Sequence, residues 1–277
     1  MVRTAIIQRI RDGRRGEEEP DAVAVEEPLE LRVEGRSIAV IMRTPGHDRE
    51  LAAGFLLTEG VIKSAKDLFD ITTCVAAAGA GKGNAVDAAL ARPEHADLDR
   101  LTRHVFTSSS CGVCSKATIE SVIKRRKPLE DDVRVSASVL LALPRRLAAA
   151  QTDFKTTGGL HACALFDARG KLLAAREDVG RHNALDKLIG WALLERLTPL
   201  AGHLVLLSGR VSFEMMQKAH AAGIPVVAAI SAPTSLAVEF ARESGQTLAG
   251  FVRGKSLNLY AGAERVITRA RGVRAAR

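Results

Sequence analysis

The chain has 277 residues, of which 47% are hydrophobic and only 4% aromatic, which suits one large domain or two modest ones with cores of Ala, Val, Leu and Ile. The formal charge of +8, from 40 Lys and Arg against 32 Asp and Glu, favours anionic partners. Four cysteines are too few for a disulfide scaffold, no apolar stretch reaches membrane-spanning length and the opening residues lack a signal peptide, so we expect a cytoplasmic protein without a membrane partner.

The N-terminal region opens on a charged stretch. Residues 11–21, RDGRRGEEEPD, are punctuated by Gly and Pro, which indicates a flexible lead-in that we extend over residues 1–28. Alternating apolar residues then predict strands over 29–33 and 38–42, joined by a hairpin turn at Glu34-Gly35. Asp48 is expected to cap a following helix that runs through Leu57.

A Cys-x-x-Cys motif is the sharpest chemical feature of the middle of the chain. Cys111 and Cys114 lie in a loop of Ser and Gly residues, after a Gly-rich loop at 78–84 and before a helix predicted over 115–125. The partial positive charge of a helix N-terminus lowers the pKa of a nearby thiol, and the thiolate is the form that attacks sulfur. The second thiol could then resolve a persulfide or a disulfide on the first.

Other chemistries for this pair have less support. A structural zinc ion needs four ligands, and neither Cys74 nor Cys163 belongs to a second ligand pair, so we expect no zinc and place both residues in the core. A thioredoxin-like switch requires the motif beside a βαβ pattern, and here it follows a stretch rich in Ala and Gly. An incidental pair of cysteines in a loop stays open as an alternative.

The C-terminal half alternates between strands and helices, after a helix expected over 136–149 that should kink or restart at Pro144. The predicted strands cover 161–166, 172–175, 204–207, 225–230 and 248–252, and the predicted helices cover 180–197, 211–222 and 234–243. This alternation predicts βαβ units, an α/β (α+β) class and a mainly parallel sheet. A boundary near 135–155 separates an N-terminal β-rich domain (29–150), which carries the cysteine loop, from a C-terminal α/β domain (151–277).

Polar turns follow two of the predicted parallel strands. Ser208, Gly209 and Arg210 follow the first, and residues 231–235 follow the next. Ligands of open α/β sheets bind outside the carboxyl ends of the strands, so these turns predict a pocket for a phosphorylated or nucleotide-like group. Either turn alone is equally well explained as an ordinary capped helix start. The segment Phe251, Val252, Arg253, Gly254, Lys255 and Ser256 adds an aromatic ring and two cations, although a strand and a hairpin turn would also account for it.

The helix expected from about Gly180 begins with a dense set of polar residues. Asp178 can cap it, whereas Arg181, His182 and Asn183 are expected to project from its first turn, where free amides and the helix dipole attract anions. His161 is interpreted either as a hydrogen-bonded strand residue or as part of a ligand pocket. Arginines crowd both termini without aromatic neighbours to stack on bases, so no nucleic-acid partner is expected.

Together, these motifs resemble the FdhD family of formate dehydrogenase accessory sulfurtransferases. The matching segments are TPGHDRELAAGFL (44–56), SSCGVC (109–114), TGGLH (157–161), EDVGRHNALDK (177–187), SGR (208–210) and SAPTSLA (231–237). The resemblance extends from about residue 30 to 262, and the motifs are specific as a set. Ser115 stands where the family often has Gly, which concerns only the flexibility of the loop.

The resemblance implies that the protein takes sulfur from a cysteine desulfurase as a persulfide on Cys111, assisted by Cys114, and passes it to bis-molybdopterin guanine dinucleotide for formate dehydrogenase. The cofactor would be bound as cargo at Phe251–Ser256, and the turn residues Ser208, Gly209 and Arg210 with His182 are the further expected contacts. The resemblance also implies a cytidine-deaminase-like fold for the C-terminal domain, without deaminase chemistry, and a homodimer. Two alternatives stay open: an enzyme of thiol–disulfide exchange, and a non-catalytic carrier of the molybdenum cofactor.

Overall fold

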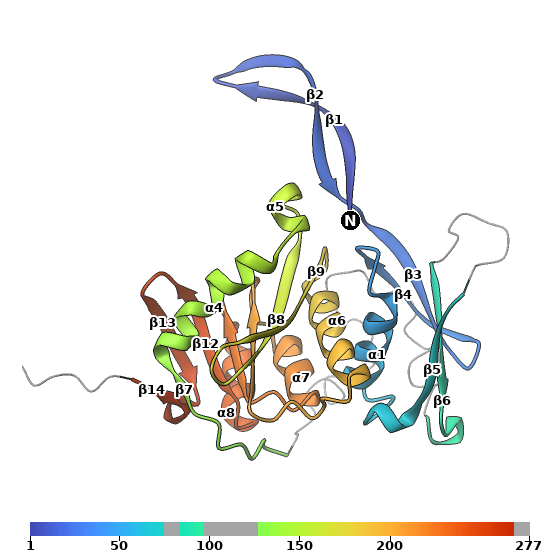
Figure 1. Ribbon diagram of the computed structural model, residues 1–277, viewed down its shortest axis with the longest axis vertical. Helices are drawn as coiled ribbons and strands as arrows, with labels where there is room; N and C mark the ends of the chain where they lie inside the picture. Colours follow the sequence, from blue (N-terminus) through green and yellow to red (C-terminus); the bar gives the residue numbers. More distant parts are fainter. Residues whose placement is uncertain (75–83, 97–126, 269–277) are drawn as a thin grey trace, which may run out of the picture.

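The computed structural model describes residues 1–74, 84–96 and 127–268 (Figure 1). Two sheets flank a central pair of helices, and a two-stranded arm extends away from the body. The mixed α/β class expected from the sequence is confirmed. Within the described ranges, no helix combines the length and apolar character needed to cross a membrane.

The arm is formed by residues that the sequence predicted to be a flexible lead-in. β1 (Val2–Arg11) pairs antiparallel with β2 (Arg14–Ala24), with Arg11 opposite Arg14 at the far end. The turn between them consists of Asp12 and Gly13, whose φ angles of 50° and 73° match a type I′ turn. The structure therefore shows paired strands where the sequence was interpreted as a flexible lead-in, because Asp-Gly is itself a strong hairpin signal.

A four-stranded sheet forms the N-terminal side of the body. Its strands lie in the order β4 (Arg36–Arg43), β3 (Glu27–Val33), β6 (Ala85–Leu90) and β5 (Leu68–Cys74). Short 3₁₀ turns cover Ala65–Asp67 and Pro93–His95. The hairpin predicted around Glu34-Gly35 is confirmed, and both turn residues have positive φ.

Helix α1 (Asp48–Thr58) follows β4 as predicted, but it begins differently. Its N-cap is His47, with a φ of 59° and no capping hydrogen bond from its side chain. Asp48 is the first helical residue, and its carboxylate accepts hydrogen bonds from Nε and Nη2 of Arg43, each at 2.9 Å. Arg43 is almost fully buried, so a carboxylate beside it offsets the cost of a buried charge.

A six-stranded sheet forms the C-terminal side. The order is β13 (Ser256–Ala261), β12 (Thr247–Arg253), β11 (Val226–Ala229), β10 (His203–Leu207), β8 (His161–Asp167) and β9 (Leu172–Asp178). The predicted parallel pairing joins β10 to β11 and β11 to β12, whereas β8, β9 and β13 pair antiparallel with their neighbours. Parallel strands are therefore confined to the centre of a mixed sheet. Beyond the sheet, β14 (Val266–Ile267) pairs with β7 (Val135–Ser136), and a 3₁₀ turn covers Ala263–Arg265.

Helices cover both faces of this sheet. One face packs against α4 (Ala137–Ala150), and the other against α6 (Arg181–Leu194), α7 (Phe213–Ala221) and α8 (Ser235–Glu243) (Figure 1). α4 is continuous through Pro144 and does not restart there. Because α4 packs on the C-terminal sheet, residues 135–150 belong to the core of that sheet and not to the N-terminal side to which we assigned them.

One hydrophobic core extends across both sides of the body, through α1 and α6, which lie side by side (Figure 1). Gly54 of α1 and Gly190 of α6 allow the two backbones to approach closely. Buried charges also join these helices to α7. Nζ of Lys218 lies 2.8 Å from Oδ2 of Asp186, and Thr58 donates to Oδ1 of the same carboxylate at 2.9 Å. The two sides therefore share one core and a set of buried polar contacts.

Candidate functional site

The predicted polar turns meet at the carboxyl ends of the parallel strands. Residues 208–210 leave β10, residues 231–233 leave β11, and Gly250 and Phe251 lie at the matching level of β12. Backbone hydrogen bonds hold the three segments together, because Val211 donates to Ala232 and Phe251 donates to Ser231, both at 3.1 Å. The structure thus brings the predicted turns into one continuous edge.

Gly209 marks the point where basic side chains approach this edge. A β-carbon on Gly209 would lie 3.1 Å from Nδ1 of His161 and 3.9 Å from Cδ of Arg181. His161 begins β8 and Arg181 begins α6, so two further elements contribute an imidazole and a guanidinium to the end of β10. The sequence left two interpretations of His161 open, a hydrogen-bonded strand residue and part of a ligand pocket. Its position beside Gly209 favours the pocket.

The electrostatics of this edge are set by the gathered cations. Burial lowers the pKa of His161, and the positive charges of Arg181 and His182 lower it further, with a smaller effect of Arg210. His161 is consequently neutral at neutral pH. Nε of Arg181 and Oγ of Ser212 are buried without a hydrogen-bond partner among the described residues. Unpaired buried donors beside cations are suited to an anionic group such as a phosphate.

His182, which we expected to contact the cofactor, has a partner inside the protein. Its Nε2 lies 2.9 Å from Oε2 of Glu214 on α7, and both side chains are largely buried. The sequence contained no signal for Glu214, because its partner lies on another helix.

Asp178 and Asn183 hold the fold together instead of facing a ligand. Asp178 accepts hydrogen bonds from the amide of Gly180 at 2.8 Å and from Nδ2 of Asn183 at 2.9 Å, and Nζ of Lys187 lies 2.7 Å from its carboxylate. It also accepts from the amide of Thr44 at 3.1 Å. The expectation that Asn183 projects toward a bound anion was wrong, because its side-chain amide donates to Asp178 and to the carbonyl oxygen of Met42 in β4.

The segment 251–256 combines strain and charge. Phe251 has a φ of 52°, a left-handed conformation that bulky residues seldom adopt, and the guanidinium of Arg253 lies 5.5 Å from the centroid of its ring. Gly254 and Lys255 form the turn to β13. Val252 is fully buried in the core beneath α4, so its side chain is not available to a ligand. Strained residues of this kind cluster at binding sites.

The cysteines divide into two groups. Cys111 and Cys114 lie outside the described residues, as do most of the Gly-rich loop at 78–84 and the helix predicted over 115–125. Cys163 is buried as expected, and burial raises the pKa of its thiol, which makes it inert. Cys74 is partly exposed, so its predicted place in the core was wrong. The described residues contain no cluster of His, Cys, Asp and Glu able to hold a metal ion.

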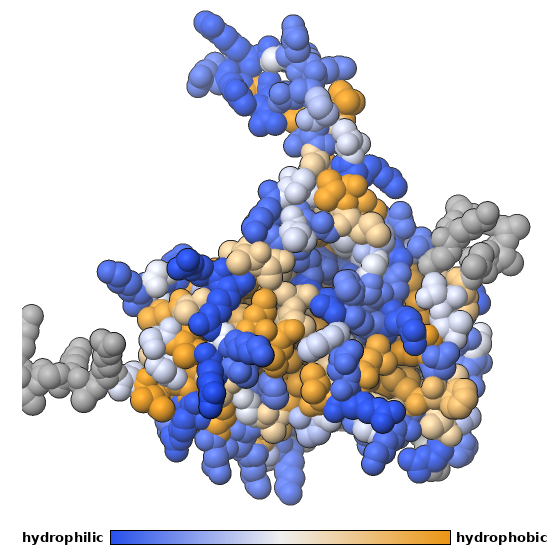
Figure 2. Space-filling model, viewed as in Figure 1, coloured by the Kyte–Doolittle hydropathy of each residue, from blue (hydrophilic) through white to orange (hydrophobic). Residues whose placement is uncertain are grey.

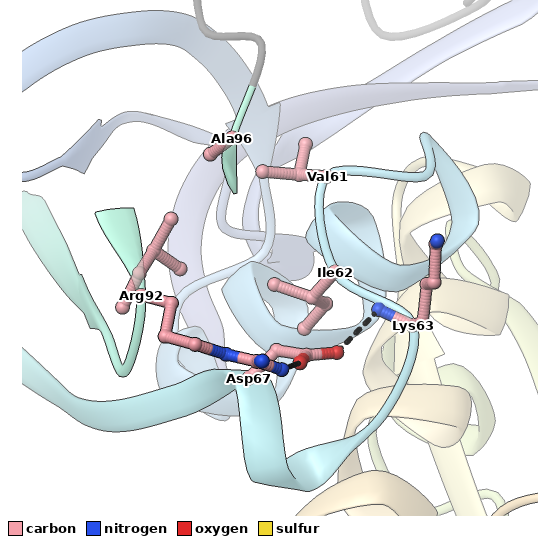
Figure 3. A pocket seen from close by; sticks show the side chains of 7 residues that line it. Val61, Ile62, Lys63, Asp67, Arg92 and Ala96 are labelled. Carbon is pink, nitrogen blue, oxygen red and sulfur yellow. Dashed lines mark hydrogen bonds and ion pairs between the residues drawn. The ribbon is translucent and has the colours of Figure 1, made fainter. Parts of the chain in front are cut away.

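A separate small pocket lies on the N-terminal side, under the loop that follows α1 (Figure 3). Ile62 forms its floor, and Asp67 accepts a hydrogen bond from the amide of Lys63 at 2.9 Å and lies 3.6 Å from Nη2 of Arg92. The sequence did not predict this pocket. Its carboxylate is already satisfied by the protein, which leaves little polar capacity for a ligand.

Comparison with known proteins places this geometry in context. The family model described as the FdhD/NarQ family matches residues 24–267. A protein named sulfur carrier protein FdhD from Mycolicibacterium paratuberculosis is 52% identical over 255 residues, 89% of this chain and 92% of the relative. A protein of the same name from Streptomyces coelicolor is 51% identical over 267 residues, 95% of this chain and 94% of the relative.

A solved structure is also similar. The crystal structure of a candidate formate dehydrogenase accessory protein from Desulfotalea psychrophila has a TM-score of 0.73 and 26% sequence identity, and the match covers 96% of this chain and 99% of that one.

Proposed function

The chain belongs to the FdhD/NarQ family, and from this premise we propose that it is a sulfurtransferase that loads sulfur onto Cys111 and delivers it to a molybdenum cofactor. Curated relatives with about half of their residues identical carry the name of a sulfur carrier, which supports the first half of the proposal. The edge formed by the neutral His161 with the cations Arg181 and Arg210 supports the second half, because the cofactor is a dinucleotide with several phosphates.

The sulfur-loading step is a thiol exchange without net oxidation. The Cys111 thiolate attacks the terminal sulfur of a persulfide on a cysteine desulfurase. The bond between that sulfur and the desulfurase cysteine breaks, the desulfurase leaves as its thiolate, and Cys111 becomes the persulfide. Cys114 assists by stabilising or resolving this species. The transferred sulfur then goes to bis-molybdopterin guanine dinucleotide. Formate dehydrogenase requires the cofactor that carries this sulfur.

The cargo is held at the carboxyl ends of β10, β11 and β12. Arg181 and Arg210 bind the phosphates, joined by hydroxyl and amide groups of residues 208–212. Arg253 and the ring of Phe251 hold the guanine nucleotide end, with Gly254, Lys255 and Ser256 in the adjoining turn. His182 supports this edge from beneath through Glu214. The protein acts in the cytoplasm as a homodimer, with formate dehydrogenase as the recipient.

Mass spectrometry after incubation with a cysteine desulfurase and cysteine tests the proposal. Wild-type protein should gain the mass of one sulfur atom on the peptide that contains Cys111, and Cys111→Ala should gain none. Cys163→Ala is the matched control, because that thiol is buried and inert, and it should load normally. Absence of sulfur on Cys111 in the wild type would contradict the sulfurtransferase proposal. It would favour a protein that only carries the cofactor.

A further inference from the structure

A second cavity lies beyond β9, and the proposed function gives it no role. Its volume is about 300 Å³, at the lower end of the range for small-molecule sites. Its walls are formed by residues 44–47 after β4, by the end of β9 and by the start of α5 (Asp153–Thr157). Met1 lines it as well, at the base of the arm, below which the surface is hydrophilic (Figures 1 and 2). Two of the family motifs, at 44–56 and 177–187, therefore meet at this cavity.

The basic side chains at this cavity are already paired inside the protein. The guanidinium of Arg176 donates to both carboxylate oxygens of Glu50, and Nζ of Lys187 lies 2.7 Å from the carboxylate of Asp178. A phosphate in the cavity would have to displace one of these carboxylates. The cavity therefore differs from the end of β10, where Nε of Arg181 has no partner among the described residues.

The open polar atoms of the cavity are hydrogen-bond acceptors. Nδ1 of His47 lies 3.1 Å from Oε2 of Glu50, to which it donates, so Nε2 of the neutral ring is left as an acceptor. Asp153 pairs through Oδ2 with the ammonium group of Met1, and Oδ1 has no hydrogen-bond partner within the described ranges. His47 also has a φ of 59°, and strained residues cluster at binding sites. A ligand suited to this cavity presents N–H groups.

We propose that this cavity, the pterin cavity, binds the pterin end of the molybdenum cofactor, with Asp153 and His47 accepting hydrogen bonds from its amino and ring N–H groups. The inference rests on the proposed function, which places the guanine nucleotide at β12 and the phosphates beside β10. Each half of the cofactor is built in the order guanine, diphosphate, pterin.

The sheet presents its binding groups in the same order. From β12 the strands follow as β11, β10, β8 and β9, and His161 at the start of β8 pairs with Asp178 at the end of β9. The pterin cavity therefore continues the edge on which the phosphates are proposed to bind. Four strand spacings of about 4.8 Å separate β12 from β9, a span of roughly 19 Å. Guanine carries the same pair of N–H donors as a pterin, but its proposed contacts, Phe251 and Arg253, lie at the far end of this span.

The fluorescence of a single tryptophan tests the proposal. Trp191 is the one Trp in the sequence, and the guanidinium of Arg176, which lines the pterin cavity, lies 5.9 Å from the centroid of its ring. Pterins absorb light in the range in which tryptophan emits, so a bound pterin should quench Trp191 by energy transfer, whereas GDP does not absorb there. Titration of the full chain with 6-hydroxymethylpterin should give saturable quenching, and saturating GDP should leave its Kd unchanged. Free N-acetyltryptophanamide, titrated in parallel, corrects for light that the pterin itself absorbs.

Variants of the two acceptors locate the binding. Asp153→Ala and His47→Asn should each weaken pterin binding about tenfold, because each change removes an acceptor. Asn tolerates the left-handed backbone at position 47 and is too short to replace Nε2. Both side chains are partly exposed, so neither change should unfold the protein. Asp132→Ala is the matched control, an exposed carboxylate outside the cavity, and should bind pterin as the wild type does.

Three results would overturn the pterin cavity: no saturable quenching of the wild type, unchanged affinity in both acceptor variants, or displacement of the pterin by GDP, which would assign the cavity to guanine. GDP affinity and sulfur loading on Cys111, measured on the same wild-type protein, test the proposed function separately. A protein that binds GDP and loads sulfur without pterin quenching contradicts only the pterin cavity. A protein that loads no sulfur contradicts the proposed function, whatever its quenching.

Discussion

Gly54 and Gly190 occupy the crossing of α1 and α6, where a β-carbon on Gly54 would overlap the carbonyl oxygen of Asp186 and one on Gly190 would overlap that of Glu50. Each glycine therefore lies against the backbone of the other helix. No flexible side chain stands between them that could move aside. The contact joins the two sides of the body.

Alanine at either glycine should destabilise the protein. Gly54→Ala or Gly190→Ala must push the helices apart, and overpacking of this kind costs about 1–3 kcal/mol or more, despite the better helix propensity of Ala. Gly159→Ala is the control, because its β-carbon would meet only the side chain of Ala24, at 3.6 Å, and the backbone oxygen of Thr157, at 3.9 Å. Urea unfolding should show a large loss for the first two variants and a change within about 0.5 kcal/mol for the third. Equal stabilities would mean that the helices can separate freely.

The buried pair Lys218–Asp186 should be far more sensitive to single than to double replacement. Lys218→Met leaves the carboxylate of Asp186 without its cation, and such a loss costs about 3–5 kcal/mol. Lys218→Met with Asp186→Leu removes both charges and should recover much of that free energy. A double-mutant cycle by chemical unfolding gives the coupling between the two residues. Additive losses would contradict an ion pair.

Glu50 should make the protein less stable in acid. Although burial opposes its ionisation, hydrogen bonds from Arg176 and His47 lower the pKa of Glu50 to about 2. Since the folded pKa lies below the unfolded value, its stabilisation is present above about pH 4.5 and is lost as the pH falls toward 2. After allowance for solvent screening, we expect about 1–2 kcal/mol from this group. Glu50→Gln should flatten the unfolding free energy over this pH window, and an unchanged pH profile would contradict the assignment.

Sulfur loading and nucleotide binding should be separable. Arg253→Ala should weaken GDP binding in calorimetry by roughly ten- to over a hundredfold, because a charged hydrogen bond is lost, yet leave persulfide loading intact. Cys111→Ala should abolish persulfide loading and leave GDP binding unchanged. Arg169→Ala is the control for charge, since Arg169 lies in the turn between β8 and β9, at the opposite edge of the sheet. Loss of sulfur loading in a folded Arg253→Ala protein would mean that the desulfurase docks on the cofactor edge.

Nucleotide affinity should rise as the pH falls through the range in which His161 gains a proton. Burial and the neighbouring cations lower the pKa of His161 in the free protein, and a bound phosphate would favour its charged form. As the pH falls below the ordinary histidine value of 6.5, we expect GDP to bind about three- to tenfold more tightly. His161→Gln should lose this rise. Calorimetry at several pH values measures it, and a flat profile in the wild type would place the phosphates away from His161.

The sequence predicted best where local pattern determines structure. The strands and helices after residue 156, and the turn at Glu34-Gly35, follow from alternation, periodicity and turn residues. The arm could have been predicted as well, because Asp12-Gly13 is a local signal. Ser208–Arg210 was identified because ligands gather at the ends of parallel strands.

Contacts between distant residues could not be predicted in this way. Asp178 was predicted to cap a helix, yet its carboxylate also accepts a hydrogen bond from the amide of Thr44, on the other side of the body. Glu214 acquires its role only from the packing of α7 against α6. The glycines at 54 and 190 were indistinguishable from ordinary helix glycines until the two helices were placed together.

The pairing of α1 with α6 also dictates the order of events during synthesis. Thr58, the last residue of α1, leaves the ribosome long before Arg181, the first residue of α6. At about 5–20 residues per second, the nascent chain must hold the apolar side of α1 without its partner for roughly 6–25 s. The N-terminal sheet can cover only part of it during that interval. The protein is therefore expected to depend on chaperones that act co-translationally, and its yield should fall when translation is slowed between these two helices.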